Sequence, residues 1–180
     1  MNMILLIGAS ASGKTEIAKR LASAYGIVKA TTHTTRPMRK GERHDIDYHF
    51  VDEATFAKME QEGAFVETTY YNGNHYGCSK AELGIDRCIV VDPVGVASYI
   101  ALGDPSLVTF YLEASKATRK ARMEGRGDDP ELIQKRLAND EVAFAKENVP
   151  PCDFVIDSND ESVEALTDKI VTLYHQKIHG

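Results

Sequence analysis

Near-continuous apolar runs alternate with amphipathic stretches along most of the chain. Apolar residues dominate positions 3–7, 88–91, 107–112 and 153–157. A short run with few polar positions is typical of a strand buried on both faces of a parallel sheet. These segments are therefore predicted to form the central strands of the fold.

Segments with a helical period lie between the apolar runs. In residues 14–25, Ile17, Ala18 and Leu21 fall on one face, and Gly26 follows as a helix-terminating residue. Similar patterns predict further helices at 52–62, 94–102, 115–124, 130–148 and 162–178. Strands that alternate with helices indicate an α/β fold, with a parallel sheet and helices on both of its faces.

Residues 32–83 interrupt this alternation. Strand signals occur at 48–51 and 65–71, and the turn signal Asn72-Gly73 predicts that His75 and Tyr76 pair back as a hairpin. This stretch is therefore predicted to form an inserted lobe of mixed β-structure, and the parallel sheet resumes after it.

Length and charge narrow the range of partners. A chain of 180 residues suits one domain with room for a small inserted lobe. The net charge of −6 argues against a general affinity for nucleic acid or for anionic membranes. Apolar runs are too short to span a bilayer, and the amino terminus lacks the features of a signal peptide.

The cysteines favour a reducing environment. Cys78, Cys88 and Cys152 are far apart in the sequence and form no CxxC pair. This spacing argues against a disulfide framework or a zinc site, and we expect a cytoplasmic protein.

The first predicted strand leads directly into a glycine-rich loop. Gly8, Gly13, Lys14 and Thr15 match the pattern G-x-x-x-x-G-K-T between a strand and a helix. Glycines let backbone N–H groups wrap around phosphate, and the helix amino terminus adds a favourable partial charge. A chance glycine turn is the alternative, but it does not account for the strand before the loop and the helix after it.

This loop predicts a nucleoside triphosphate site. Lys14 would reach the β- and γ-phosphates, and the Thr15 hydroxyl would bind Mg²⁺. The predicted ATP-binding residues are Gly8, Ala9, Ser10, Ala11, Ser12, Gly13, Lys14 and Thr15.

A second candidate anion site lies in the inserted segment. Arg36 and Arg39 lie in a loop rich in hydroxyl groups and could grip a phosphate group through paired N–H donors. Tyr48 and Tyr76 add hydroxyl groups that suit a phosphate monoester. A solvated basic loop is the alternative.

Several short motifs follow the glycine loop in order. They are Thr34-Thr35-Arg36, Arg39, Gly41-Glu42, Asp47-Tyr48-His49-Phe50-Val51, Phe65-Val66-Glu67, Gly73-Asn74-His75-Tyr76-Gly77, Glu124-Gly125-Arg126-Gly127 and Lys135-Arg136-Leu137. In this combination the chain resembles the guanylate kinase family over essentially its whole length. Each motif alone is modest, whereas their order behind the glycine loop is specific.

The resemblance implies a reaction and its substrates. Guanylate kinases transfer a phosphoryl group from ATP to GMP with Mg²⁺, giving ADP and GDP, and dGMP is a further candidate acceptor. The resemblance also implies a single domain over residues 1–180. Its parts would be a core of residues 1–31, 84–112 and 149–180, a GMP-binding lobe of residues 32–83 and a helical lid of about residues 113–148. Whether the protein is a monomer or a homodimer is left open.

The resemblance assigns roles to residues of the inserted segment. Arg36, Arg39, Tyr48 and Tyr76 would hold the GMP phosphate, with Thr32 at the position of an assisting serine.

A second group of residues would contact the base. Glu67 would accept hydrogen bonds from N1–H and the 2-amino group of guanine, a donor pair that adenine lacks. Asp92 would lie near the guanine, although a helix N-cap is the alternative for this residue, as an exposed strand position is for Glu67.

Arginines of the predicted lid would stabilise the transferred phosphoryl group. Arg122 and Arg126 are four residues apart and Arg136 lies on the next predicted helix, whereas Arg119 and Lys120 better suit a solvated basic face. The predicted catalytic residues are Lys14, Arg39, Arg122, Arg126 and Arg136.

The sequence departs from the family pattern at a few positions. Cys78 replaces a serine or threonine that contacts the base, and Val90 replaces an acidic residue. Residues 81–87 are too few for a helix common in the family, and residues 157–160 match the adenine-side turn only loosely. These changes bear on acceptor choice more than on the class of reaction.

Two other functions remain open. A related kinase of the same fold could phosphorylate another acceptor, such as ribose 1,5-bisphosphate. A catalytically inactive guanylate-kinase-like module is the second, but Lys14 and the lid arginines, which such modules typically lack, are present here.

Overall fold

The structure is a computed structural model that describes residues 2–71 and 73–180. The chain divides into two compact units, one of residues Ala30–Ile85 and one of residues Asn2–Lys29 and Asp86–Gly180. We call them the small unit and the large unit and describe each by itself.

A five-stranded parallel sheet forms the centre of the large unit. Its order is β2-β7-β1-β8-β9, and the β1–β8, β2–β7 and β8–β9 pairs are parallel, with Leu5 opposite Thr109. The strands are β1 (Asn2–Ile7), β2 (Val28–Lys29), β7 (Ile85–Val91), β8 (Leu107–Glu113) and β9 (Phe154–Asp157).

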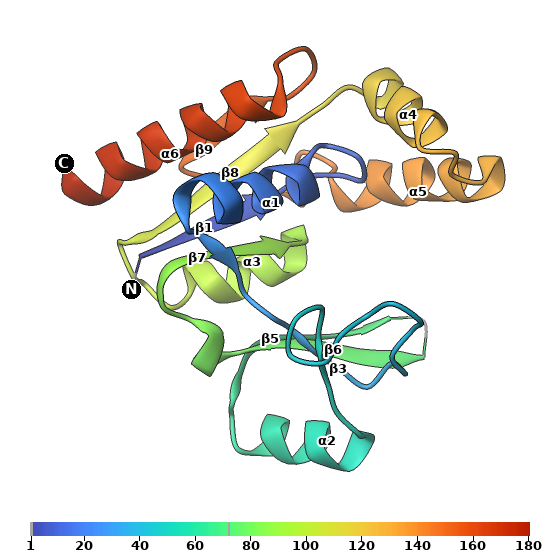
Figure 1. Cartoon of the computed structure of the whole chain (residues 1–180), viewed down its shortest axis with the longest axis vertical. Helices are drawn as coiled ribbons and strands as arrows, with labels where there is room; N and C mark the ends of the chain where they lie inside the picture. The colour runs from blue at the N-terminus through green and yellow to red at the C-terminus, as the bar shows by residue number, and fades with distance from the viewer. Residues whose placement is uncertain (1, 72) are drawn as a thin grey trace. The chain divides into compact units, whose positions relative to one another are not determined.

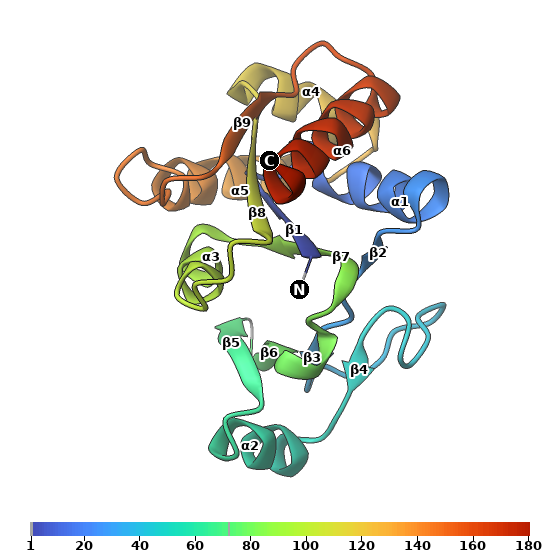
Figure 2. The same ribbon diagram turned by 90° about the vertical axis from the view of Figure 1, so that its left-hand side faces the viewer.

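Helices cover both faces of this sheet, as predicted. Helices α1 (Lys14–Tyr25) and α6 (Val163–His179) pack together on one face, and α3 (Pro93–Ile100) and α5 (Pro130–Ala143) lie on the other (Figures 1 and 2). Helix α4 (Lys116–Gly125) pairs with α5. The α/β architecture predicted from the alternating pattern is therefore confirmed.

Strand β1 is the most deeply buried part of the sheet. All residues from Met3 to Ile7 are 0% exposed. Ile4 and Leu6 join a core with Ile17, Leu21 and other residues of α1 and α6, while alternate positions face the opposite side of the sheet. Burial on both faces explains why the run contains no polar residue.

The small unit contains a mixed four-stranded sheet of order β4-β3-β6-β5. Its elements are β3 (His33–Thr34), β4 (His49–Phe50), α2 (Glu53–Gln61), β5 (Phe65–Tyr71), β6 (Asn74–Ser79) and the 3₁₀ helix η1 (Lys80–Glu82). Strands β5 and β6 are antiparallel, so the predicted hairpin pairing is confirmed, although Asn72 of its turn lies outside the described residues. Buried Phe56 of α2 stacks on Phe65 with ring centroids 4.6 Å apart.

The ends of some elements differ from prediction. Helix α5 stops at Ala143 and not near residue 148, because Phe144 leaves the helical conformation and the Asn148 side chain donates to the Val142 carbonyl. Pro150 and Pro151 follow, and a residue before proline disfavours the helical conformation. Strand β7 begins earlier than predicted, at Ile85.

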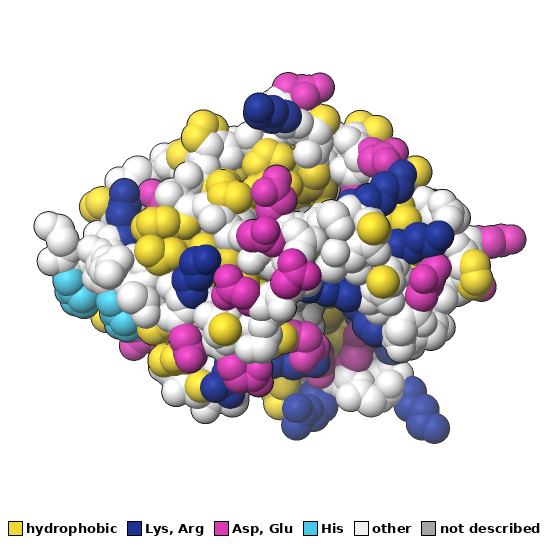
Figure 3. Space-filling view, turned by 90° about the horizontal axis from the view of Figure 1, so that it is seen from above, with side chains coloured by type: hydrophobic (Ala, Val, Ile, Leu, Met, Phe, Trp, Pro, Cys, Tyr) yellow, Lys and Arg dark blue, Asp and Glu magenta, His cyan; other side chains and the backbone are white. Residues whose placement is uncertain are grey.

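The surface carries charges of both signs, and the cysteines are thiols. Acidic and basic side chains are interspersed over the face shown in Figure 3. All three cysteines are free thiols in the structure. Within residues 2–71 and 73–180, no helix has both the length and the apolar character that crossing a bilayer requires.

Replacing Phe110 tests whether the sheet and the α6 layer form one core. Phe110 is 0% exposed and stacks on Phe154 at 5.2 Å. We expect Phe110→Ala to lower the free energy of unfolding by about 3–5 kcal/mol, through lost transfer free energy and a cavity. Urea denaturation measures this loss. Val155→Ala on neighbouring β9, where Val155 is 61% exposed, should cost less than about 1 kcal/mol and serves as the control. Equal losses would contradict this account.

Candidate functional site

The glycine loop turns sharply at the end of β1. A Cβ atom on Gly8 would lie 2.5 Å from Ser12 Oγ and 2.8 Å from the Leu112 carbonyl oxygen, so only glycine fits there. Gly13 has a left-handed φ of 101° directly before α1. Ala11 also has a left-handed φ, of 61°, which costs an alanine about 1–2 kcal/mol.

Lys14 folds back over this loop. Its Nζ donates to the carbonyl oxygens of Gly8 and, at 2.8 Å, Ala9, and lies 3.4 Å from Ser12 Oγ. Burial lowers the pKa of Lys14 to about 8, a drop that the Asp140 carboxylate opposes. The ammonium group thus rests where the loop would enclose a phosphate group.

A cavity of about 510 Å³ opens beside the loop. Its lining residues come from the loop, the start of α1, α4 with its C-cap, and the start of α6 with the segment before it. They are Ala11, Ser12, Gly13, Lys14, Thr15, Glu16, Ile17, Arg122, Arg126, Glu161, Val163 and Leu166. The first N–H groups of a helix have no carbonyl partner within that helix, so the start of α1 offers donors to an anion in this cavity.

The donor set beside the cavity contains little that would hold a metal ion alone. Thr15 contributes a neutral hydroxyl group at the cavity wall. Among the described residues, no three His, Cys, Asp or Glu side chains gather in a group that could hold a metal ion. This set suits a cation bound mainly by the oxygens of a nucleotide.

Arg122 joins three segments around the loop. Its guanidinium donates to the Ala11 carbonyl oxygen at 3.1 Å, to that of Ser158, and to that of Asn159 at 3.3 Å. The buried Ser158 hydroxyl donates to the Ser12 carbonyl oxygen at 2.9 Å. The predicted lid residue Arg122 is therefore placed against the loop.

The other two predicted lid arginines meet at one carboxylate. Arg126 Nη2 lies 2.9 Å and Arg136 Nη1 lies 3.2 Å from Asp128 Oδ2. Both arginine side chains are about half exposed, 54% and 49%. Because α4 ends at Gly125, Arg126 is the C-cap of the helix.

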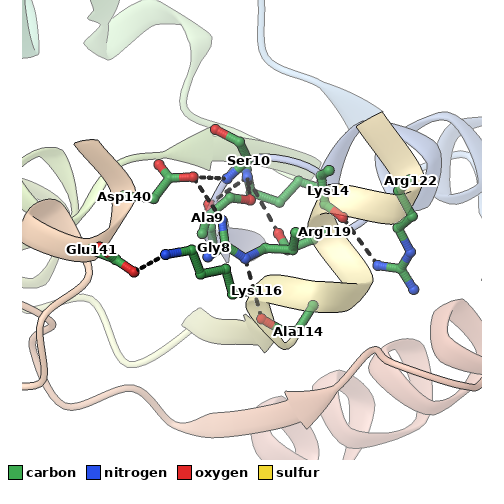
Figure 4. A network of polar contacts seen from close by, with 12 residues as sticks. Gly8, Ala9, Ser10, Lys14, Ala114, Lys116, Arg119, Arg122, Asp140 and Glu141 are labelled. Carbon is green, nitrogen blue, oxygen red and sulfur yellow. Dashed lines mark hydrogen bonds and ion pairs between the residues drawn. The ribbon is translucent and has the colours of Figure 1, made fainter. Parts of the chain in front are cut away.

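The expectation that Arg119 lies on a solvated face is wrong. Its side chain is only 8% exposed, and Nη1 lies 2.9 Å from Asp140 Oδ2 on α5 (Figure 4). Arg119 Nε also donates to the Ala114 carbonyl oxygen at 3.3 Å. The sequence pattern failed here because a buried carboxylate from another helix neutralises the charge. Lys120 is exposed, as expected.

In the small unit, Arg36 is held by a carboxylate and two aromatic rings. Its Nη2 and Nη1 donate to Glu42 Oε1 at 2.7 Å and Oε2 at 3.1 Å, and its guanidinium carbon lies 5.4 Å from the Tyr48 ring centroid and 5.7 Å from that of Phe50. The hydrogen bonds to Glu42 raise the pKa of Arg36 above its ordinary value. Burial, followed by proximity to Tyr76, raises that of Tyr48.

The structure brings most of the predicted phosphate-binding residues of the small unit together. The Tyr48 and Tyr76 ring centroids are 6.2 Å apart. The backbone N–H of Arg39 donates to the same Glu42 carboxylate at 2.8 Å, while its side chain is exposed. Thr32 is half-buried directly before β3, and its carbonyl oxygen accepts from the His49 N–H at 2.9 Å.

The predicted base-binding residues of β5 and β6 are direct cross-strand neighbours. Glu67 lies opposite Cys78, and Thr69 lies opposite Tyr76, beyond an irregularity between Phe65 and Glu67. Residues opposite each other in an antiparallel pair share a face of the sheet. Glu67 is half-buried, unlike an ordinary exposed strand residue, and Cys78 is 0% exposed.

Asp92 belongs to the large unit and begins α3. Its Oδ1 accepts from the Gly95 N–H at 2.7 Å, the geometry of an N-cap. The helix-capping alternative for Asp92 is thus observed, and a role at the base remains a prediction.

Sequence reasoning missed a charged cluster beside Tyr48. His49 Nδ1 lies 2.6 Å from Asp45 Oδ1, and Nε2 lies 2.9 Å from Glu82 Oε1. Burial pulls the pKa of His49 down, but the hydrogen bonds to both carboxylates outweigh it and the pKa lies above its ordinary value. The hydrogen bond to His49 lowers the pKa of Asp45. The alternation of His and acidic residues over 44–49 was the available signal, but Glu82 is too distant in sequence to be linked with it.

This cluster predicts pH-dependent stability. A raised pKa means that protonated His49 stabilises the fold fully below about pH 6.5 and less as pH rises through its folded pKa. Because the pKa of Asp45 is lowered, its carboxylate stays negatively charged over the pH range in which His49 loses its proton. Calorimetry should therefore show a larger loss of Tm for His49→Gln at pH 6 than at pH 8.5, with about 2–4 °C lost per kcal/mol. His175→Gln, on the exposed side of α6, is the control. A loss that does not vary with pH would contradict the charged bridge.

Comparison with known proteins agrees with this geometry. The chain matches the family model of guanylate kinase over residues 1–173. A guanylate kinase of Coxiella burnetii is 33% identical over 177 residues, covering 92% of this chain and 84% of that relative. One of Legionella pneumophila is 34% identical over 176 residues, covering 92% of this chain and 82% of the relative.

A solved structure gives the same result in three dimensions. The crystal structure of guanylate kinase from Anaplasma phagocytophilum has a TM-score of 0.70 and 26% identity, covering 98% of this chain and 86% of that chain. Since the family model spans nearly the whole sequence, the chain belongs to the guanylate kinase family.

Proposed function

We propose that the protein transfers the γ-phosphoryl group of ATP to GMP, giving ADP and GDP. The observation that carries this proposal is the glycine loop beside the cavity of the large unit, with the Lys14 ammonium group held inside it, in a chain of this family. The phosphates of ATP would replace the loop carbonyl oxygens as partners of Lys14.

Magnesium would arrive with the nucleotide. The Thr15 hydroxyl and phosphate oxygens would hold Mg²⁺, with water completing the six ligands that the ion prefers. The ion supplies neutralisation of charge on the phosphate oxygens. The protein would contribute the N–H donors at the start of α1 and the charge of Lys14.

The small unit would bind the acceptor phosphate. Guanidinium and hydroxyl donors would come from Arg36, Arg39, Tyr48 and Tyr76. Thr32, the residue before β3, would add a further hydroxyl group. Arg36 would exchange its Glu42 partner for the phosphate group of GMP. The bidentate geometry that Arg36 already adopts with a carboxylate matches the way guanidinium groups bind phosphate.

Glu67 would select guanine. Its carboxylate can accept hydrogen bonds from N1–H and the 2-amino group, and burial would strengthen the selection because unpaired polar groups are costly there. Cys78, its cross-strand neighbour, offers only a weak hydrogen-bonding group. Asp92 is proposed as an additional contact to the base.

Arginines would stabilise charge during transfer. The reaction needs in-line placement and compensation of charge on the equatorial oxygens, more than covalent help from the protein. Lys14, Arg39, Arg122, Arg126 and Arg136 are the proposed catalytic residues. Residues of about 113–148 would act as a lid that excludes water. The three free thiols support a reducing, cytoplasmic setting.

An acceptor screen tests the proposed reaction. We expect coupled ADP release with GMP and dGMP and much less with AMP, CMP, UMP or ribose 1,5-bisphosphate. Lys14→Ala should lose nearly all turnover while its circular dichroism spectrum stays unchanged, because the loop would lack its cation. Transfer to ribose 1,5-bisphosphate would identify another kinase of this fold, and activity with none of these acceptors would favour a binding module.

Arg126→Ala tests the role of the lid. Loss of a transition-state contact should lower kcat by about 100-fold or more and change KM for ATP far less. Lys120→Ala, which removes an exposed cation from the same helix, is the matched control. A change confined to KM would refute a transition-state role for Arg126.

A further inference from the structure

Two residues of the glycine loop are tied to helices distant in sequence. The backbone N–H of Ser10 donates to Asp140 Oδ2 on α5 at 3.0 Å, across 130 residues of sequence (Figure 4). Ala11, the next residue, contacts α4 and α5. We call Ser10 and Ala11 the loop apex.

Asp140 is well placed to hold the apex because a cation fixes it. The same oxygen, Oδ2, accepts from Arg119 Nη1 at 2.9 Å, and the two side chains are 12% and 8% exposed. A nearly buried carboxylate is stable only with charge compensation and hydrogen bonds. Arg119 supplies the charge and Ser10 supplies a second donor, so the three groups form one unit.

Ala11 adds two contacts of another kind. Its methyl group packs against an apolar cluster of Met123, Ile133 and Leu137, which joins α4 to α5. Its carbonyl oxygen accepts from Arg122 Nη1 at 3.1 Å. These contacts hold Ala11 in a left-handed conformation that a non-glycine residue disfavours.

The apex contacts leave other loop donors for the ligand. The Ser10 N–H is engaged by Asp140 and the Ser12 N–H by the Ala9 carbonyl oxygen. The N–H groups at the start of α1 remain for phosphate. The apex therefore serves as an anchor, while the following residues form the binding surface.

We propose that Asp140 is a positioning residue for phosphoryl transfer, which fixes the loop apex to the α4–α5 pair. Because of this anchor, the phosphate-binding N–H groups and the Arg122 guanidinium keep a fixed position relative to each other. The proposal rests on the proposed function, in which this loop holds ATP. Displacement of reacting groups by about 1 Å can cost roughly 100-fold in rate.

Asp140→Asn tests the proposal. An amide is neutral and cannot compensate the charge of Arg119. Its oxygen would replace Oδ2 only as an uncharged acceptor, which holds Arg119 and Ser10 more weakly than a carboxylate does. We expect kcat to fall about tenfold or more at a temperature well below the Tm of the variant, with KM for GMP within about twofold of wild type. Hydrogen exchange at the Ser10 amide of the unliganded protein should become faster.

A neighbouring residue provides a matched control. Glu141 is the next residue on α5, but its side chain is 55% exposed and pairs with Lys116 at the surface (Figure 4). Glu141→Gln removes the same charge from the same helix and should leave kcat within about twofold of wild type. An equal loss in both variants would overturn a specific role for Asp140.

Unchanged kcat in Asp140→Asn would also overturn the proposal, even if Tm falls, because a purely structural residue would behave in this way. If Asp140→Asn does not fold, Asp140→Glu decides. It keeps the charge but moves the carboxylate by one methylene group, and we expect a lower kcat at unchanged KM for GMP. Wild-type kcat in that variant would contradict the proposal.

Failure of the proposed function is detected separately. If the wild-type protein does not phosphorylate GMP, titration calorimetry with ADP still tests the anchor. Weaker ADP binding and faster Ser10 exchange in Asp140→Asn would then support it. Unchanged values of both would overturn it.

Discussion

Complete burial of residues 3–7 in β1 is the constraint on which the rest of the large unit depends. The chain turns sharply at the end of this buried strand. Gly8 permits the turn because it has no Cβ that would collide with Ser12 and Leu112. Helix α1 then begins beside the cavity, and its first N–H groups have no carbonyl partner within the helix. The site is thus a consequence of how the core is packed.

The structure pairs many of its candidate phosphate-binding cations with its own oxygen atoms. Lys14 binds loop carbonyl oxygens, Arg36 binds Glu42, and Asp128 accepts from Arg126 and Arg136. Each of these oxygen partners would hold its cation in place while no nucleotide is bound. This arrangement limits repulsion among like charges at a cost in binding free energy, since a ligand must replace existing partners.

Most of the structural features that could be predicted from the sequence were predicted from local patterns. Apolar runs and glycine spacing depend on neighbouring residues, so the sheet, the helices and the loop could be predicted. The Arg119–Asp140 pair could not, because it joins two helices whose charged faces look solvent-exposed in sequence. The link from His49 to Glu82 was missed for the same reason. The end of α5 depended on Phe144 and on a side-chain hydrogen bond from Asn148, which helical periodicity does not encode.

The Arg36–Glu42 pair has a consequence for discrimination among small anions. A carboxylate already occupies the guanidinium fork with two hydrogen bonds. Chloride or another singly charged anion gains little by replacing it, whereas a phosphate monoester carries about −1.5 to −2 charge at neutral pH and three acceptor oxygens. In the proposed function, the resident carboxylate would therefore favour a phosphate monoester over singly charged anions as the partner that replaces it on Arg36.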